Sequence, residues 1–200
     1  MQIRSIIFVC LLSITSFVSA FANEQKIIKE LKEGGKLILI RHSEAPGTGD
    51  PAHFNLSDCK TQRNLSAEGI EQAKRLGEFF KKNNISFEKV YSSEYCRCKD
   101  TARNAFKDFE TFSGLNSTFA DTSKTAAYMK KTKEFIEKLD KSKNYIFVAH
   151  HTTIDGLAGT FAGSGEMVIV DRSYKVIGTF KVNEHTSFSN IALVRYAFCI

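Results

Sequence analysis

Three short apolar runs stand out along the chain, and helical periodicity follows each of them. The predicted strands that contain these runs span Lys36 to Arg41, Lys89 to Ser92 and Tyr145 to Ala149. Continuous apolar runs of this length are typical of strands buried on both faces of a parallel sheet. After Ser66, apolar residues recur at helical spacing, and Glu68 lies in the first turn, where a carboxylate stabilises a helix. The pattern therefore predicts strands that alternate with helices.

The remaining segments extend this alternating order. We expect a helix directly after the second strand, running through Thr101, Ala105 and Phe106. Further helices are expected at Glu24–Glu33, Lys124–Leu139 and Thr152–Thr160, a hairpin at Met167–Val170 and Val176–Val182, and a final strand at Ile191–Ile200. Both prolines fall within Ser43–Asn64, which predicts a long loop of the kind that often carries function. Together these elements predict an α/β three-layer sandwich with a mostly parallel central sheet, helices on both faces and an antiparallel edge.

Residues 1–22 have the features of a secretory signal peptide. Arg4 precedes an apolar stretch from Ile6 to Val18, and small residues follow, ending at Ala20 and Ala22. The apolar stretch is short for a bilayer span, so we expect cleavage near Ala20 or Ala22. Residues 23–200 then have the size of one catalytic domain, which we expect to be periplasmic or secreted, with no further transmembrane segment.

The charge of the chain favours small anionic ligands over nucleic acid. The net charge is +6, and the loss of Arg4 with the signal peptide lowers it to about +5. The lysines are spread over the helical segments, with no dense basic arm and no nucleic-acid-binding motif. The expected partner is therefore a small phosphorylated substrate or a phosphorylated glycolipid, and the sequence leaves the oligomeric state open.

Four cysteines remain after the signal peptide, namely Cys59, Cys96, Cys98 and Cys199. An exported chain can oxidise them, and four cysteines allow three complete pairings. Cys96 and Cys98 are two residues apart and point to opposite sides of a helix or strand, so we do not expect them to pair with each other. A bridge from Cys59 to either one would tie the long loop to the segment that carries Arg97. The Cys-Arg-Cys spacing is too tight for the common zinc knuckle.

Reactive side chains follow each of the three predicted parallel strands. Arg41 and His42 follow the first, Arg97 lies shortly after the second, and His150 and His151 follow the third. Neighbouring parallel strands present their carboxyl ends to one edge of the sheet, so these side chains are expected to meet there. Guanidinium groups bind phosphoryl oxygens in pairs, and nearby cations keep an imidazole unprotonated. The sequence thus predicts phosphoryl transfer through a phosphohistidine, without metal or cofactor.

Four segments that carry these residues occur in the order typical of one family. They read LILIRHSEA, LSAEGIEQAKRLGEFF, VYSSEYCRCKDTARNAF and IFVAHHTTIDGLAG. With them the chain resembles the histidine phosphatase superfamily, which has the phosphoglycerate-mutase-like fold, in its smaller branch and its secreted bacterial members. The resemblance implies that His42 is the phosphorylated nucleophile, and that Arg41, Arg97 and His150 bind the phosphoryl group. It implies an exported, metal-independent phosphatase acting on phosphomonoesters.

The chain departs from the usual family pattern beside both histidines. Ser43 and His151 stand where the family commonly has glycine. A serine there would be strained if the backbone required a positive φ. Ser43 and Asn64 are candidates for substrate binding, and Gln62 and Arg63 could also line the pocket.

The leaving alkoxide needs a proton donor, and the sequence does not single one out. The candidates are carboxylates of the loops near the expected site: Glu44, Glu94, Glu110 and Asp121, with Asp50 and Asp108 as further possibilities.

Other readings remain as alternatives. A non-catalytic protein of the same fold could keep the anion pocket and bind a phosphorylated ligand without turnover. A cysteine phosphatase could use Cys98 and Arg103, although four residues separate them rather than the five of such phosphate loops, and no glycine lies between. A metallohydrolase could use His42, His150 and His151, but the chain lacks a helical i, i+4 ligand pair among them. Mutases of this fold act on cytosolic intermediates, so export favours a hydrolase.

Overall fold

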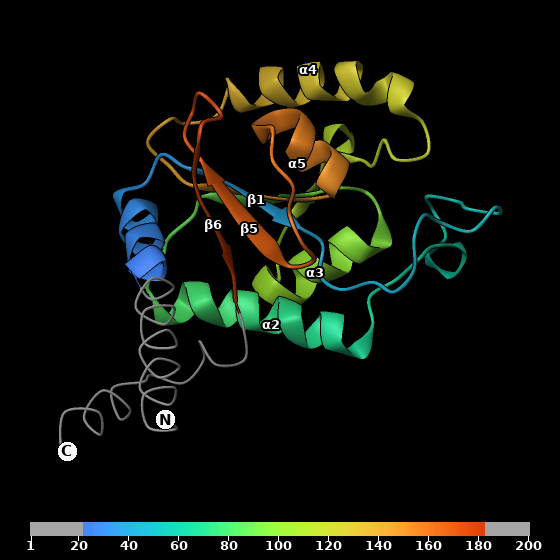
Figure 1. The fold of residues 1–200 in the computed structure, drawn as a ribbon, viewed down its shortest axis with the longest axis horizontal. Helices are drawn as coiled ribbons and strands as arrows, with labels where there is room; N and C mark the ends of the chain where they lie inside the picture. The colour runs from blue at the N-terminus through green and yellow to red at the C-terminus, as the bar shows by residue number, and fades with distance from the viewer. Residues whose placement is uncertain (1–21, 183–200) are drawn as a thin grey trace, which may run out of the picture.

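A mixed six-stranded sheet forms the centre of the computed structural model, which describes residues 22–182 (Figure 1). The strand order is β3-β2-β4-β1-β5-β6. The strands are β1 (Leu37–Arg41), β2 (Lys89–Ser92), β3 (Glu110–Thr111), β4 (Tyr145–Ala149), β5 (Glu166–Val170) and β6 (Val176–Lys181). β1 to β4 are parallel to one another, while β5 runs antiparallel to β1 and β6. The expected mostly parallel sheet with an antiparallel edge is confirmed; the two-residue strand β3 has no counterpart among the predicted elements.

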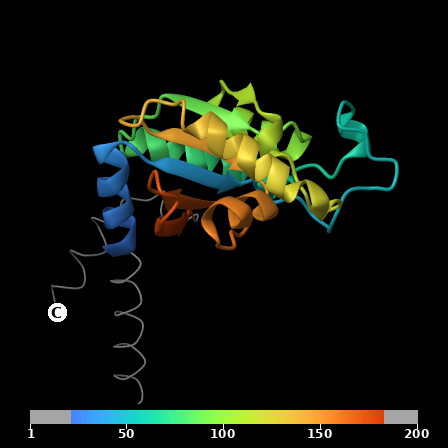
Figure 2. The same cartoon turned by 90° about the horizontal axis from the view of Figure 1, so that it is seen from above.

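Helices cover both faces of this sheet, as the sequence pattern predicts. The helix over residues 22–33 lies with α2 (Ala67–Lys82) and α3 (Cys96–Phe106) on one face, and α4 (Thr125–Ile136) lies with α5 (His151–Ala158) on the other (Figures 1 and 2). Two apolar cores result, one under each helical layer. In the first, Leu31, Leu76 and Phe80 pack against alternate residues of the central strands. In the second, Ile136 and Ile154 pack against the other set. This alternation explains why the strand runs are apolar throughout.

The register of the parallel strands brings the expected functional segments together. Ile40 of β1 and Ser92 of β2 both pair with Val148 of β4, so the three strands end level with one another. The ladder continues one residue further, because the His42 backbone N–H donates to the Ala149 carbonyl at 2.9 Å. The Ser93 backbone N–H likewise donates to the Val148 carbonyl at 2.9 Å.

The segment from Ser43 to Asn64 is a long loop, as expected, and it projects beyond the carboxyl end of the parallel strands (Figures 1 and 2). It contains one short 3-10 helix, η1 (Cys59–Thr61). A disulfide joins Cys59 to Cys96 at the start of α3, with 5.7 Å between the two Cα atoms. Cys98 is free and buried. Of the two bridges considered for Cys59, the structure therefore contains the one to Cys96.

Two sequence predictions fall outside the described residues. The expected signal peptide lies outside them, apart from its last residue, Ala22. Cys199 and the expected final strand Ile191–Ile200 also lie outside the described residues. Within residues 22–182, no helix is long and apolar enough to cross a membrane. The predicted helix at Thr152–Thr160 is α5, which begins one residue earlier, at His151.

Candidate phosphoryl-transfer site

His42 lies directly after β1 and is almost fully buried. Its Nδ1 lies 2.8 Å from the backbone carbonyl oxygen of Ser43. A carbonyl oxygen only accepts hydrogen bonds, so Nδ1 carries the proton and Nε2 keeps its lone pair. Burial lowers the pKa of His42 to about 3, and Arg97 and Arg41 add to this effect. The imidazole is therefore neutral at physiological pH and presents an unprotonated nitrogen, the form that a nucleophile requires.

Two arginines flank this imidazole. Arg41 donates through Nη1 to the Ala162 carbonyl at 2.9 Å. Arg97, the second residue of α3, is 3% exposed, and its Nη2 approaches His150 Nδ1 at 3.4 Å. Burial lowers the pKa of Arg41, and the charge of Arg97 lowers it further. The second contribution shows that the two guanidinium groups lie close enough to repel one another.

Several buried polar atoms around His42 have no hydrogen-bond partner. Among the described residues, Arg41 Nε, Arg97 Nε, Ser43 Oγ and Thr152 Oγ1 belong to this set. Buried polar groups are normally paired, because an unpaired one costs about 1–3 kcal/mol. All four belong to the segments that meet at the carboxyl end of the parallel strands. Two of them are cationic donors, so an oxyanion is the partner that their chemistry favours.

His150 is the start of a chain of directed hydrogen bonds. Its Nδ1 accepts from Arg97, and its Nε2 lies 3.0 Å from Ser93 Oγ. Ser93 Oγ in turn donates to Asn116 Oδ1 at 2.9 Å, and Asn116 Nδ2 donates to Glu94 Oε2 at 2.6 Å. Burial lowers the pKa of His150, with His42 and Arg97 contributing in the same direction. The chain fixes both the orientation and the tautomer of the ring.

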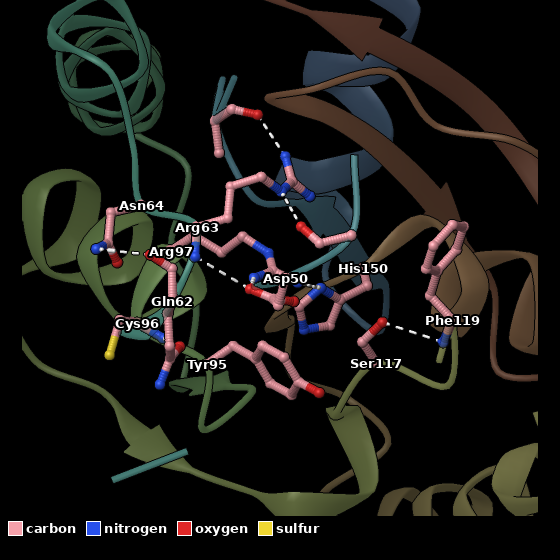
Figure 3. Close-up of polar contacts among 12 residues, drawn as sticks. Asp50, Gln62, Arg63, Asn64, Tyr95, Cys96, Arg97, Ser117, Phe119 and His150 are labelled. Carbon is pink, nitrogen blue, oxygen red and sulfur yellow. Dashed lines mark hydrogen bonds and ion pairs between the residues drawn. The ribbon is translucent and has the colours of Figure 1, made fainter. Parts of the chain in front are cut away.

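The long loop reaches into the site through Asp50. Asp50 Oδ1 accepts from Arg97 Nη1 at 2.8 Å and from the Arg63 backbone N–H at 3.1 Å (Figure 3). The Arg63 side chain donates to the Gly49 and Ala45 carbonyls and so holds the same loop in a turn. Burial lowers the pKa of Arg63, and the charge of Arg97 adds to the shift. A third guanidinium group therefore lies beside the two that flank His42.

The disulfide and Gln62 anchor this loop to α3. Gln62 Oε1 accepts from the Cys96 backbone N–H at 2.9 Å, and its Nε2 donates to the Asn55 and Leu56 carbonyls. The Cys59–Cys96 bridge lies at the same helix terminus, one residue before Arg97. Both contacts fix the segment from which Arg97 projects.

The predicted proton donors divide into two groups by position. Glu44 accepts from Ser66 Oγ, and Glu94 accepts from Asn116, so both lie in segments that join the strand ends. Glu110 and Asp121 are exposed and paired with lysines, Glu110 with Lys89 across strands β3 and β2 and Asp121 with Lys124 at 3.1 Å. The structure does not bring Glu110 or Asp121 into contact with the histidines.

Ser43 and Asn64 occupy different surroundings. Ser43 is fully buried beside His42, its backbone N–H donates to Thr101 Oγ1 at 2.9 Å, and it has no positive φ. The replacement of the family's usual glycine is therefore unstrained. Asn64 is exposed and donates to the Cys59 and Gln62 carbonyls, so its amide holds the loop together.

Sequence reasoning missed Thr101 and Asn116 as supports of the site. Thr101 Oγ1 accepts from the Ser43 backbone and donates to the Arg97 carbonyl at 2.7 Å. Thr101 is one helical turn after Arg97, and that spacing could have signalled it. Asn116 lies in an irregular segment after η2 (Ser113–Leu115), where no sequence periodicity points to it.

Cys98 lacks the properties of a phosphatase nucleophile. Its side chain is fully buried, and burial raises the pKa of the thiol to about 12. A thiol that stays protonated at neutral pH is a poor nucleophile. Arg103, the arginine considered with it, is exposed and pairs with Asp100.

The segment that carries much of this site matches a known protein family. Residues 37–121, which include β1, β2 and α3, match the sequence profile of the histidine phosphatase superfamily (branch 1). This match assigns residues 37–121 of the chain to the histidine phosphatase superfamily. A 2,3-bisphosphoglycerate-dependent phosphoglycerate mutase of Lactobacillus acidophilus is 33% identical over 76 residues, as is one from Lactobacillus johnsonii. Each match covers 36% of this chain and 30% of the mutase, so the chain spans under a third of the curated relatives it matches.

Solved structures of histidine phosphatases and mutases share the fold. A phosphoglycerate mutase from Thermus thermophilus superposes with a TM-score of 0.55 at 17% identity, covering 74% of this chain and 99% of the mutase. The protein histidine phosphatase SixA, solved with tungstate, gives 0.53 at 12% identity over 73% and 96% of the two chains. A putative phosphohistidine phosphatase SixA from Agrobacterium tumefaciens gives 0.54 at 14% identity over 74% and 98%. The chain thus has the phosphoglycerate-mutase-like fold expected from its sequence.

Proposed function

We propose that this histidine phosphatase is an exported, metal-independent phosphohydrolase that cleaves phosphomonoesters through a phosphohistidine on His42. Arg41, Arg97 and His150 bind the phosphoryl group. The observation that carries the proposal is the state of His42, which donates through Nδ1 to the Ser43 carbonyl and leaves Nε2 unprotonated between two arginines. Nucleophilic attack needs that lone pair, and the phosphoryl charge needs those cations.

The reaction follows in two steps. His42 Nε2 attacks phosphorus, the P–N bond forms, and the bond from phosphorus to the ester oxygen breaks. The leaving alkoxide takes a proton from a neighbouring acid, for which Glu94 and Glu44 are the candidates nearest the strand ends. The acid, now a carboxylate, then takes a proton from a water molecule as that water attacks the phosphohistidine and the P–N bond breaks. Orthophosphate leaves, and His42 regains its neutral form.

The unpaired donors support the binding roles. Arg41 Nε and Arg97 Nε are buried without a protein partner, and each can donate to an oxygen of the transferred group. Arg97 Nη2 also donates to His150 Nδ1, so His150 lies beside the guanidinium group that contacts the anion. The tungstate bound in the SixA structure is a tetrahedral oxyanion of the same shape as phosphate, which supports an oxyanion site in this fold.

The export of the protein and its substrate class belong to the same proposal. The Cys59–Cys96 disulfide supports an oxidising compartment, in agreement with the leader-like residues 1–22 and a periplasmic or secreted location. The substrate is then a small phosphorylated molecule or a phosphorylated glycolipid. The alternative is a protein that binds a phosphorylated ligand at this site without hydrolysing it. The experiment must distinguish this binding protein from the phosphatase.

The test is phosphate release from a panel of phosphomonoesters by the mature protein, with a chelator and without added metal. Activity that survives the chelator and is lost in His42→Ala is the expected result. A protein that binds orthophosphate through Arg41 and Arg97 but releases none from any ester would support the binding-protein alternative. Turnover that His42→Ala retains would overturn the phosphohistidine route. Loss of turnover on chelation would contradict the metal-independent mechanism.

A further inference from the structure

Two exposed phenylalanines, Phe119 and Phe161, both lie against the ring of His151. Among residues 22–182, Phe119 and Phe161 are the large apolar side chains left open to solvent, with exposed fractions of 49% and 66%. Their ring centroids lie 5.9 and 6.0 Å from the centroid of the His151 ring. A single exposed apolar side chain is ordinary, whereas two that contact the same neighbour form a small apolar patch.

This patch adjoins the phosphoryl-binding groups. The Arg41 guanidinium lies 5.5 Å from the centroid of the Phe161 ring, and His151 directly follows His150. Phe119 lies beyond His150 as seen from Asp50 (Figure 3). A methyl group on Gly49 would come within 3.9 Å of Phe119 Cε1, so the long loop also reaches the patch.

The patch differs in charge from the cluster of arginines beside it. Burial and the neighbouring Arg41 lower the pKa of His151, so all three rings are neutral at physiological pH. Arg41, Arg97 and Arg63 form this cluster, and their charges attract a doubly charged phosphoryl group. A ligand that fits both surfaces has a phosphoryl group at one end and a flat apolar face directly next to it.

We propose that Phe119, His151 and Phe161 form the subsite for the leaving group, and that it takes phosphomonoesters whose alcohol carries an aromatic or heteroaromatic ring. The inference rests on the proposed function, because it presumes that the phosphoryl group binds at Arg41 and Arg97. Aromatic rings pair edge-to-face or in offset stacks at centroid distances of about 4.5–7 Å, so a ligand ring can contact these side chains without moving the pocket.

Non-hydrolysable ligands test the subsite apart from turnover. Titration calorimetry would compare phenylphosphonate with methylphosphonate, whose carbon–phosphorus bonds the enzyme does not cleave. We expect phenylphosphonate to bind the native protein about fivefold to tenfold more tightly, as one favourable aromatic contact provides. Phe119→Ala and Phe161→Ala should each reduce this ratio, and the double variant should bring it to about one.

Orthophosphate affinity, measured in parallel, reports on the phosphoryl pocket alone. Phe161 contacts Arg41, so Phe119→Ala is the cleaner of the two single variants. Phe109→Ala serves as the control, because the Phe109 ring lies against Arg103 rather than His151. Equal affinity of the native protein for the two phosphonates, or a ratio that survives in the double variant, would overturn the subsite. Absence of orthophosphate binding in the native protein would instead overturn the proposed function.

Discussion

A carboxylate of the long first loop, Asp50, forms an ion pair with the buried guanidinium of Arg97 at 2.8 Å. The Arg97 side chain is 3% exposed and that of Asp50 16%. Asp50 also accepts from the Arg63 backbone, so the loop is folded around this contact. Arg97 is therefore held in place by a fixed negative charge that lies close to the proposed position of the phosphoryl group.

Removing this charge should strengthen phosphate binding. Asp50→Asn keeps an oxygen that accepts from Arg97 and Arg63, but it removes a carboxylate that repels an oxyanion. At an effective dielectric constant of about 20, two unit charges about 8 Å apart repel by about 2 kcal/mol, so the change should tighten orthophosphate binding by roughly tenfold or more. The inhibition constant for orthophosphate, measured in the phosphatase assay or by calorimetry, checks the expectation.

Asp58→Asn provides the matched control for Asp50. Asp58 lies in the same loop and accepts from the Lys60 backbone at 2.9 Å, away from the arginines. The same chemical change there should leave the orthophosphate constant as it is in the native protein. Weaker phosphate binding in Asp50→Asn would mean that the charge orients Arg97 and does not compete with the ligand.

The lowered pKa of His42 predicts how stability depends on pH. An unfolded histidine takes up its proton as the pH falls through 6.5, whereas folded His42 does so only near pH 3. The stabilising contribution of the neutral ring is therefore full above pH 6.5 and declines as the pH falls below it. Between pH 8 and pH 5 the native protein should lose about 2 kcal/mol of unfolding free energy through this group.

Urea unfolding of the native protein and of His42→Gln at both pH values isolates this contribution. The variant lacks the titrating ring but keeps His150, whose pKa is also lowered and which destabilises both proteins in acid. Between pH 8 and pH 5, the native protein should lose more unfolding free energy than His42→Gln loses. Equal losses in the two proteins would contradict the burial of a neutral His42.

Breaking the Cys59–Cys96 disulfide should lower both stability and activity. The bridge closes a loop of 37 residues, for which the lost chain entropy corresponds to about 4 kcal/mol. Activity should fall as well, because the bridge and Gln62 fix the turn that carries Arg97. Phosphate release and thermal unfolding, each with and without a reductant, measure the two effects.

The double variant Cys59→Ser with Cys96→Ser serves as the reference for that experiment. It should already show the reduced stability and activity, and a reductant should change neither any further. Reduction that destabilises the native protein but leaves its specific activity intact would show that the bridge supports the fold without positioning Arg97.

Gly77 marks the tightest contact between α2 and α3. A methyl group at this position would lie 2.0 Å from the Ala105 backbone carbonyl oxygen, so the two helices would have to separate. Alanine in place of glycine inside a helix ordinarily stabilises by up to about 1 kcal/mol. Here Gly77→Ala should instead destabilise by about 1–3 kcal/mol, the usual cost of overpacking. A urea midpoint at or above that of the native protein would contradict the observed helix contact.

Much of the fold was predictable because the apolar patterns are local and strong. The runs in β1, β2 and β4 are apolar because both faces of the sheet are covered, and level strand ends then bring His42, Arg97 and His150 together. The order of strands and helices along the chain is enough to predict that these three residues converge. The roles of these residues came from the family resemblance, and the structure adds the tautomer of His42 through its contact with Ser43.

The rest of the site depends on contacts that sequence periodicity does not record. The sequence suggests Asp50 only as a proton donor, because nothing in the loop sequence indicates that this residue folds back onto Arg97. Asn116 and Phe119 lie in irregular segments far along the chain from the residues they approach. β3 has only two residues and pairs through Glu110 and Thr111, which are exposed, so it carries no apolar run.

Trapping the covalent intermediate tests the central claim most directly. The mature protein would be mixed briefly with a ³²P-labelled phosphomonoester that it hydrolyses, quenched in alkali, digested and mapped. We predict an alkali-stable, acid-labile label on the peptide that contains His42, and its loss in His42→Ala. Label on another residue, or none under conditions where orthophosphate is released in a single-turnover burst, would contradict the phosphohistidine mechanism.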